Sequence, residues 1–156
     1  MSFSIRRAQA VDAQALLDLR KASILGLCAR HYPHEDLVAF TAVKVNPAFL
    51  AILEGRFYLA ERDGIIVGSG LINLADGQVD AIFVHPEVAG RGVGRAMMAH
   101  LEGLARSSGL GGMKQEATLN AAAFYRRLGF VGDKQSVYVT RNGLALACVP
   151  MIKALV

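Results

Sequence analysis

The feature that most constrains the fold is a set of alternating glycines between a predicted strand and a predicted helix. Gly90, Gly92 and Gly94 follow an apolar segment, residues 78–85, and open an amphipathic stretch that ends near Ser107. Glycines here let the backbone turn tightly and approach a ligand closely. Because the first amides of a helix have no partner inside it, they form a natural anion site. The pattern therefore predicts an α/β chain that holds a phosphate-like group where this helix begins.

The residues around these glycines separate this turn from the two familiar nucleotide-binding loops. The Walker pattern ends in Gly-Lys-Ser/Thr, and this segment does not. The dinucleotide fingerprint is Gly-x-Gly-x-x-Gly directly after a strand, whereas here the glycines alternate and follow a loop that contains Pro86. Arg91 and Arg95 can add charge-assisted hydrogen bonds to a phosphate. They favour an anion site over the alternative, a glycine-rich turn that only connects strand to helix.

Hydrophobic periodicity in the rest of the chain predicts one mixed α/β domain over residues 1–156, with its sheet antiparallel in the middle. Asp63-Gly64 is typical of a tight hairpin turn. The predicted strands cover residues 3–7, 57–62, 65–73, 78–85, 113–118, 136–140 and 144–151, and the predicted helices cover residues 11–25, 33–43, 92–107 and 121–128, with a helical turn at 49–53.

Composition excludes several classes of protein. The 156 residues are 53% hydrophobic and 19% charged, which is typical of one globular domain and not of a disordered chain. No apolar run approaches the roughly twenty residues of a membrane-spanning helix. Asp12 and Gln14 interrupt the segment after Arg6 and Arg7, so we expect no export signal. Cys28 and Cys148 are isolated, and we expect buried thiols in a reducing cytoplasm.

The charge distribution and the positions of the histidines limit the classes of ligand that the chain can bind. The formal net charge of +4 is spread along the chain, without the basic stripe and interleaved aromatics that nucleic-acid binders use. We therefore expect no nucleic-acid partner and a small anionic ligand instead. His31 and His34 stand near Glu35 and Asp36, but no third distant ligand accompanies the histidines, so we expect no metal.

Two segments resemble the signatures of the GNAT superfamily of N-acetyltransferases. Residues 83–95, FVHPEVAGRGVGR, look like its acyl-CoA signature, and residues 116–130, EATLNAAAFYRRLGF, look like its second signature. Their order, their spacing and the predicted elements before them also match, so the resemblance covers nearly the whole chain. It implies a mixed, largely antiparallel central sheet flanked by helices, in which the fourth and fifth strands splay apart to admit the pantetheine arm of acetyl-CoA.

The resemblance also implies which residues bind acetyl-CoA. Backbone groups of the fourth strand would pair with pantetheine, and the glycine-rich turn would cradle the pyrophosphate. Asn120 would hydrogen-bond pantetheine. The alternative for Asn120 is a helix N-cap, and it can fill both roles. Ala89 stands where the family usually has Gln or Arg, which puts one side-chain contact in doubt. The implied binding residues are Phe83, Val84, Gly90, Arg91, Gly92, Val93, Gly94, Arg95, Asn120 and Tyr125.

Acetyl transfer to an amine needs a neutral amine, a stabilised oxyanion and a proton for the thiolate that leaves. The resemblance implies that the amide near Val84 stabilises the oxyanion and that Tyr125 donates the proton; the alternative for Tyr125 is a packing role beside Phe124. The general base is open between Asp80, which we prefer, Glu116 and water.

The acceptor side is less well defined by sequence. By the same resemblance, the loop between the first two helices lines the acceptor pocket, so His31 and Tyr32 are candidates together with Glu116. Residues 111–116 are more polar than in the family, and we expect a short or irregular fifth strand. The expected function is acetyl-CoA-dependent acetylation of a small-molecule, peptide or protein amine; the alternative is a non-catalytic acyl-CoA sensor. A homodimer through the terminal hairpin is compatible with this fold.

Overall fold

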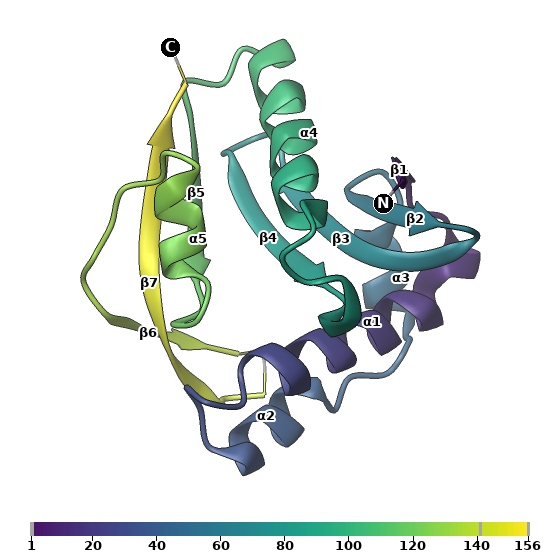
Figure 1. Cartoon of the computed structure of the whole chain (residues 1–156), viewed down its shortest axis with the longest axis vertical. Helices are drawn as coiled ribbons and strands as arrows, with labels where there is room; N and C mark the ends of the chain where they lie inside the picture. Colours follow the sequence, from purple (N-terminus) through teal and green to yellow (C-terminus); the bar gives the residue numbers. More distant parts are fainter. Residues whose placement is uncertain (1, 141, 156) are drawn as a thin grey trace.

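The computed structural model describes residues 2–140 and 142–155, and one seven-stranded sheet organises them in the order β1-β2-β3-β4-β5-β7-β6 (Figure 1). The strands are β1 (Ser4–Arg7), β2 (Phe57–Arg62), β3 (Ile65–Asn73), β4 (Gln78–Val84), β5 (Gly112–Ala117), β6 (Ser136–Val139) and β7 (Ala145–Ala154). The helices are α1 (Ala13–Leu27), α2 (His34–Thr41), α3 (Pro47–Leu53), α4 (Val93–Ser107) and α5 (Ala122–Arg127), with short 3-10 turns η1 (Ala10–Asp12) and η2 (Pro86–Val88).

The sheet consists of two antiparallel parts that meet at a parallel contact. Strands β1 to β4 pair antiparallel in chain order, and β7 pairs antiparallel with β5 and β6. Between β4 and β5 the structure has a single residue pair, Gln78 with Lys114. Because this pair lies near the start of β4, the two strands diverge toward their carboxyl ends (Figure 1). The mixed, largely antiparallel sheet with a splay between its fourth and fifth strands is thus confirmed.

Helices cover both faces of the sheet. α4 and α5 pack on one face, where Met97, Leu101 and Tyr125 join the largest hydrophobic cluster. α1 and α3 pack on the other face, where Leu16 and Leu53 form a second cluster. The largest cluster takes side chains from both antiparallel parts of the sheet, so it holds the molecule together across the splay.

A β-bulge in β4 changes which side chains share a face. Ser69 pairs with Phe83 but Leu71 pairs with Asp80, so β4 carries one extra residue opposite β3. Ala81 absorbs the bulge with a positive φ of 57°, and the buried Ser69 hydroxyl donates a hydrogen bond to the Ala81 carbonyl at 2.8 Å. Since Val79 packs on the α4 side and Phe83 on the α1 side, the bulge places Asp80 and Phe83 on the same face.

Several boundaries differ from the sequence expectations. The predicted hairpin around Asp63 and Gly64 is confirmed, with φ of 52° and 78°. The first helix begins with a 3-10 turn and extends to Leu27, and the last strand extends to Ala154. The expectation of an irregular fifth strand is wrong. β5 is six residues long and pairs with β7 over its whole length, because alternate residues of this polar segment, such as Met113 and Ala117, face the core.

Other expectations concern thiols, membranes and assembly. Cys28 and Cys148 are free and buried. No helix within residues 2–140 and 142–155 is long and apolar enough to cross a membrane. Every residue of the edge strand β6 is exposed, including Val137 and Val139. The homodimer through this hairpin stays a prediction.

The bulge should depend on the Ser69 hydroxyl. We expect Ser69→Ala to lower the free energy of unfolding by about 1–2 kcal/mol, because the partly buried Ala81 carbonyl loses its donor. Urea unfolding measures this loss. Ser136→Ala is the matched control on the exposed strand β6 and should change stability by less than about 0.5 kcal/mol. Equal stabilities of the two variants would contradict this role of Ser69.

Candidate active site

The centre of the site is the edge of β4 that faces the splay. The His85 amide donates to the Val67 carbonyl at 2.9 Å, which fixes the side of β4 that bonds β3. Hydrogen-bonding direction alternates along an antiparallel strand, so the backbone groups of Ile82 and Val84 point away from β3. β5 does not pair with β4 at that level. This edge can therefore pair with an extended ligand that carries amide groups, in the manner of an added strand.

The Val84 amide already has a partner inside the protein. It donates to the hydroxyl of Ser23, a buried residue of α1, at 3.3 Å. This contact confirms that the Val84 amide points into the splay and not toward β3. It also places a hydroxyl beside the amide that the sequence suggests as the oxyanion donor.

The start of α4 leaves a group of amides without partners. The Ala96 amide donates to the Gly92 carbonyl and the Arg91 amide to the Val88 carbonyl, whereas no described residue accepts from the amides of residues 92–95. Gly90 and Gly92 have φ of 77° and 89°, and a Cβ on either would meet no atom within 4 Å. The turn thus combines open space with amides that lack partners, which is the chemistry of an anion site at a helix N-terminus. Of the predicted amides, only that of Arg91 is used internally.

Gly94 has a different role from the other two glycines. A Cβ at this position would lie 3.3 Å from the Phe124 ring and 3.5 Å from the Val84 side chain. Gly94 therefore allows α4 to pack closely against α5 and β4. The side chains of Arg91 and Arg95 are exposed beside the open turn.

Asn120 lies just beyond β5, on the opposite side of the splay from β4. Its Oδ1 atom is buried and has no hydrogen-bond partner. The alternative role as a helix N-cap is not realised, because Ala121 is the N-cap of α5 and no side chain caps this helix. A buried acceptor without a donor is costly. An N–H group of a bound pantetheine arm would satisfy it, so this residue fits the expected ligand.

Tyr125 is on α5 and is 5% exposed. Its ring makes edge-to-face contacts with Phe124 and Phe130, with centroids 5.1 and 5.8 Å apart. Burial raises the pKa of the Tyr125 phenol far above its ordinary value. The phenol therefore stays protonated and does not act as a base. The packing role weighed from the sequence is present as well.

Asp80 and Glu116 come together at the vertex of the splay through Gln78. The Gln78 side-chain amide donates to Glu116 Oε2 at 2.8 Å and to Asp80 Oδ1 at 3.3 Å. Desolvation, together with the negative charges of Glu116 and Asp76, raises the pKa of Asp80 to about 6 even though the side chain keeps exposed surface. A carboxylate of this proton affinity is suited to general-base work near neutral pH.

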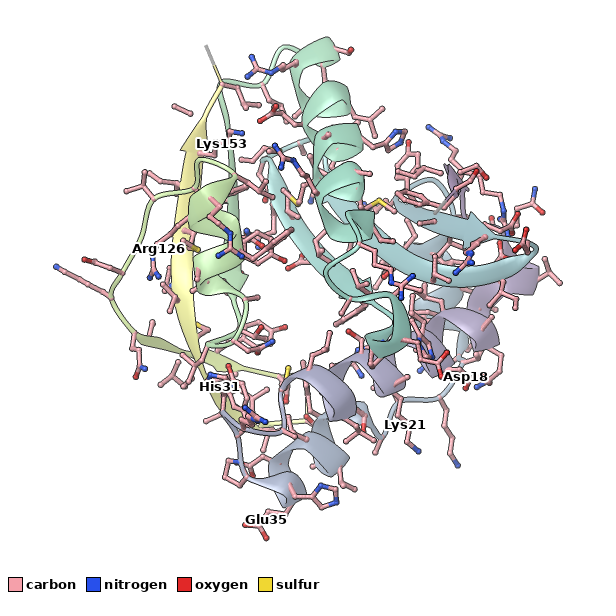
Figure 2. The ribbon with its side chains drawn as sticks, in the orientation of Figure 1. Asp18, Lys21, His31, Glu35, Arg126 and Lys153 are labelled. Atoms are coloured by element: carbon pink, nitrogen blue, oxygen red, sulfur yellow. The ribbon has the colours of Figure 1, made fainter. Side chains whose placement is uncertain are left out.

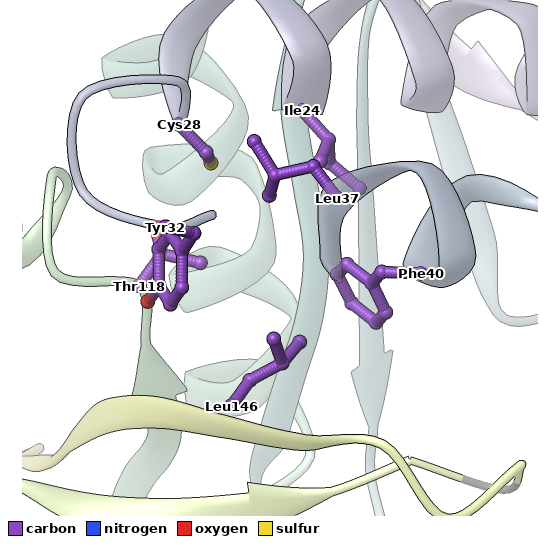
Figure 3. Close-up of a pocket in the computed structure, with 7 residues that line it drawn as sticks. All are labelled: Ile24, Cys28, Tyr32, Leu37, Phe40, Thr118 and Leu146. Carbon is purple, nitrogen blue, oxygen red and sulfur yellow. The ribbon is translucent and has the colours of Figure 1, made fainter. Parts of the chain in front are cut away.

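The two candidates from the loop after α1 lie in different environments. His31 is exposed on this loop (Figure 2). Tyr32 is buried; its hydroxyl donates to the Ala147 carbonyl at 2.6 Å and accepts from the Leu119 amide at 3.0 Å. Tyr32, but not His31, lines a small apolar pocket near the end of β5 (Figure 3). The pocket is lined by Ile24, Cys28, Tyr32, Leu37, Phe40, Thr118 and Leu146.

Comparison with known proteins identifies the family. Residues 54–132 match the model of the acetyltransferase (GNAT) domain. The chain belongs to the GNAT acetyltransferase family. The resemblance noted in the sequence is thereby confirmed. In the part of the chain that the structure describes, this GNAT site has no cluster of three or more His, Cys, Asp or Glu side chains that could hold a metal ion.

Individual relatives of this GNAT chain agree with the assignment. A protein of Azospirillum brasilense described as an IAA acetyltransferase is 35% identical over 82 residues, which is 48% of this chain and 54% of that protein. The match thus spans about half the length of this curated relative. A structure from Rhodopseudomonas palustris, described as "GCN5-Related N-acetyltransferase: Aminotransferase, Class-II", has a TM-score of 0.90 and 29% identity, and covers 99% of this chain and 97% of its own.

Two more distant structures share the GNAT fold and were solved with ligands. The PaiA N-acetyltransferase of Thermoplasma acidophilum, in complex with coenzyme A, has a TM-score of 0.78 and 18% identity and covers 99% of this chain and 100% of its own. The putative acetyltransferase YncA of Salmonella typhimurium, with acetyl-CoA, has a TM-score of 0.65 and 22% identity and covers 100% and 95%. At these identities the likeness concerns the fold.

Three polar residues of this GNAT site were missed in the sequence analysis. Gln78 bonds Glu116 and Ser23 bonds Val84, in both cases far apart in sequence, and no local pattern indicates these bonds. Arg20 did leave a signal, since it stands one turn after Leu16 and one turn before Ile24 on the buried stripe of α1. A cation in an apolar stripe is uncommon unless it has a partner.

The raised pKa of Asp80 should make the stability of the fold depend on pH. An unfolded aspartate has a pKa of about 3.9, so the folded state binds this proton more tightly, and ionisation of Asp80 destabilises the fold as pH rises through about 6. We expect Asp80→Asn to melt at a higher temperature than the wild type above pH 6, and the difference to vanish near pH 4. Thermal unfolding across this pH range measures it. Asp133→Asn, at an exposed site, is the control, and an equal gain in both variants would refute the assignment.

Proposed function

We propose that this chain is an acetyl-CoA-dependent N-acetyltransferase that moves the acetyl group directly to an amine. The observation that carries the proposal is the continuity of the binding surface. The unpaired edge of β4 leads to the free amides at the start of α4, and the buried Asn120 Oδ1 without a donor lies across the splay. An extended arm that carries amides and ends in a pyrophosphate has the chemistry to satisfy all three.

Each part of the binding surface would hold a different part of this cosubstrate. The backbone groups of Ile82 and Val84 would pair with the pantetheine arm, while those of Phe83, also expected from the sequence, point toward β3. Asn120 Oδ1 would accept a hydrogen bond from an N–H group of the arm. The amides of residues 92–95 would bind the pyrophosphate, assisted by Arg91 and Arg95. Ala89 offers no polar side chain, so the backbone carries this part of the binding.

The same residues define roles in the chemistry. Bound acetyl-CoA supplies the activated thioester. The Val84 amide would stabilise the oxyanion, with the Ser23 hydroxyl beside it as a second polar group. Tyr125 would donate a proton to the sulfur, and Asp80 would take the amine proton directly or through water. Glu116 shares Gln78 with Asp80 and remains the other candidate base. The two free, buried cysteines support a cytoplasmic location for this activity.

Acetyl-CoA binding is the first expectation to test. Ligand at 100 times its dissociation constant should stabilise the wild type by about 2.7 kcal/mol, or roughly 5–10 °C in melting temperature. We expect Gly92→Glu to abolish this shift, because residue 92 needs a positive φ and its side chain would enter the open anion site with a negative charge. Differential scanning fluorimetry measures both.

The control is Gly103→Glu, which adds the same side chain to an exposed position of the same helix where a Cβ meets nothing. It should keep the full shift. If millimolar acetyl-CoA does not raise the melting temperature of the wild type, the proposed function is wrong.

Tyr125→Phe separates turnover from binding. The ring contacts survive the change while the proton donor is lost, so we expect kcat to fall by about a hundredfold or more with little change in the KM for acetyl-CoA. Tyr58→Phe, at another buried tyrosine far from the splay, should leave kcat unchanged. The release of free CoA thiol is the measurement. If the wild type binds acetyl-CoA but no amine is acetylated, the chain is a sensor of acyl-CoA instead.

A further inference from the structure

Arg20 stands at the acceptor side of the site. Its guanidinium lies 4.5 Å above the Phe40 ring of α2 and 5.8 Å from the Phe83 ring of β4, so it is held between two helices and the sheet. Tyr138 of β6 is close enough to interact with it electrostatically. Four elements thus converge on one cation, which is half-buried in the wall of the site.

The charge of Arg20 is not balanced within the described residues. One guanidinium N–H donates to the Phe40 carbonyl at 2.9 Å, near the end of α2, where a cation is favourable. No Asp or Glu of residues 2–140 and 142–155 forms an ion pair with it. Desolvation lowers the pKa of Arg20. A guanidinium has five N–H donors in a planar fork. Among the described residues only the Phe40 carbonyl accepts from it, so donors remain for an anionic ligand.

The position of the fork relates it to the reacting end of the site. Ser23, one turn further along α1, bonds the Val84 amide where the acetyl group is expected. Phe83, on which the guanidinium packs, precedes Val84 and shares its face of the sheet with Asp80. On its other side, Phe40 lines the small apolar pocket of Figure 3. The cation therefore lies between the reaction centre and an apolar pocket.

We propose that Arg20 binds the carboxylate of the acceptor, and that the acceptors are α-amino acids. The carboxylate would form a bidentate pair with the remaining guanidinium donors, and the amine would face the thioester beside Val84. The pocket beyond Phe40, of about 10 Å³, has room for one water molecule and does not hold the acceptor side chain. This inference rests on the proposed function and specifies its substrate class.

The reaction is balanced without any further reactant. The amine nitrogen forms a bond with the acetyl carbon, and the bond between this carbon and the sulfur breaks with its electron pair on sulfur. The nitrogen loses one proton to Asp80 or water, and the sulfur gains one from Tyr125. The carboxylate that Arg20 holds is unchanged.

Matched acceptors test the inference. L-Leucine and L-phenylalanine are compared with L-leucinamide and L-phenylalaninamide, which keep the size but lose the negative charge. We expect the wild type to favour the acids by about ten- to hundredfold in kcat/KM. Arg20→Met keeps much of the packing on Phe40 and should remove this preference. Lys21→Met removes the same charge from an outward-facing position of α1 and should retain it (Figure 2).

Product binding gives a second readout that needs no turnover. N-Acetyl-L-leucine should bind the CoA-loaded wild type about ten- to hundredfold more tightly than N-acetyl-L-leucinamide in calorimetry, and equally weakly to Arg20→Met. Equal affinities in the wild type, no binding of either compound, or a preference that survives in Arg20→Met would each overturn the inference. If acetyl-CoA itself does not bind, the proposed function fails first; if it binds and amides are acetylated as well as acids, only the role of Arg20 fails.

Discussion

The rest of the structure depends on the single pair that joins β4 to β5. A second or third pair would close the sheet and bury the edge that the site needs. Each of these strands is instead secured on its other side, β4 by β3 and β5 by β7. The hydrophobic cluster under α4 and α5 spans both parts, so it supplies the cohesion that strand pairing omits. The proposed binding surface depends on this incomplete pairing between β4 and β5, which the packing on one face of the sheet stabilises.

The bulge at Ala81 determines which side chains of β4 lie on the same face of the sheet beside the splay. It brings a carboxylate and an aromatic ring of one strand to the same face, where a regular strand would separate them. That face then carries Asp80 near the vertex and Phe83 near the wide end, with Arg20 packed on the ring. The opposite face stays apolar and packs on α4. The proposed base and the proposed acceptor contact thus share one face, whereas the proposed proton donor Tyr125 belongs to the hydrophobic cluster on the other face.

Sequence patterns gave the elements and the anion site because these depend on local chemistry. Gly90 and Gly92 need positive φ, and the hairpin at Asp63 and Gly64 needs it too, so residue type alone indicates the turns. Ala81 adopts a positive φ without any such signal, since alanine does not favour it. The Ser23 bond to Val84 joins residues 61 positions apart, and such pairs follow only from the packing of α1 on β4. The raised pKa of Asp80 has the same origin, because desolvation is a property of the assembled site.

The Tyr32 hydroxyl joins segments that are far apart in the chain: its partners are 87 and 115 positions away, at the end of β5 and on β7. Gln78 makes a similar link at the vertex, from β4 to Glu116 of β5. Gln78 therefore joins the two strands at the vertex, and Tyr32 joins the loop after α1 to the β5–β7 side of the splay. Such hydrogen bonds restrict how far the connected segments can move apart. Both sets of hydrogen bonds form within the protein alone, so these parts of the splay are connected before any ligand arrives.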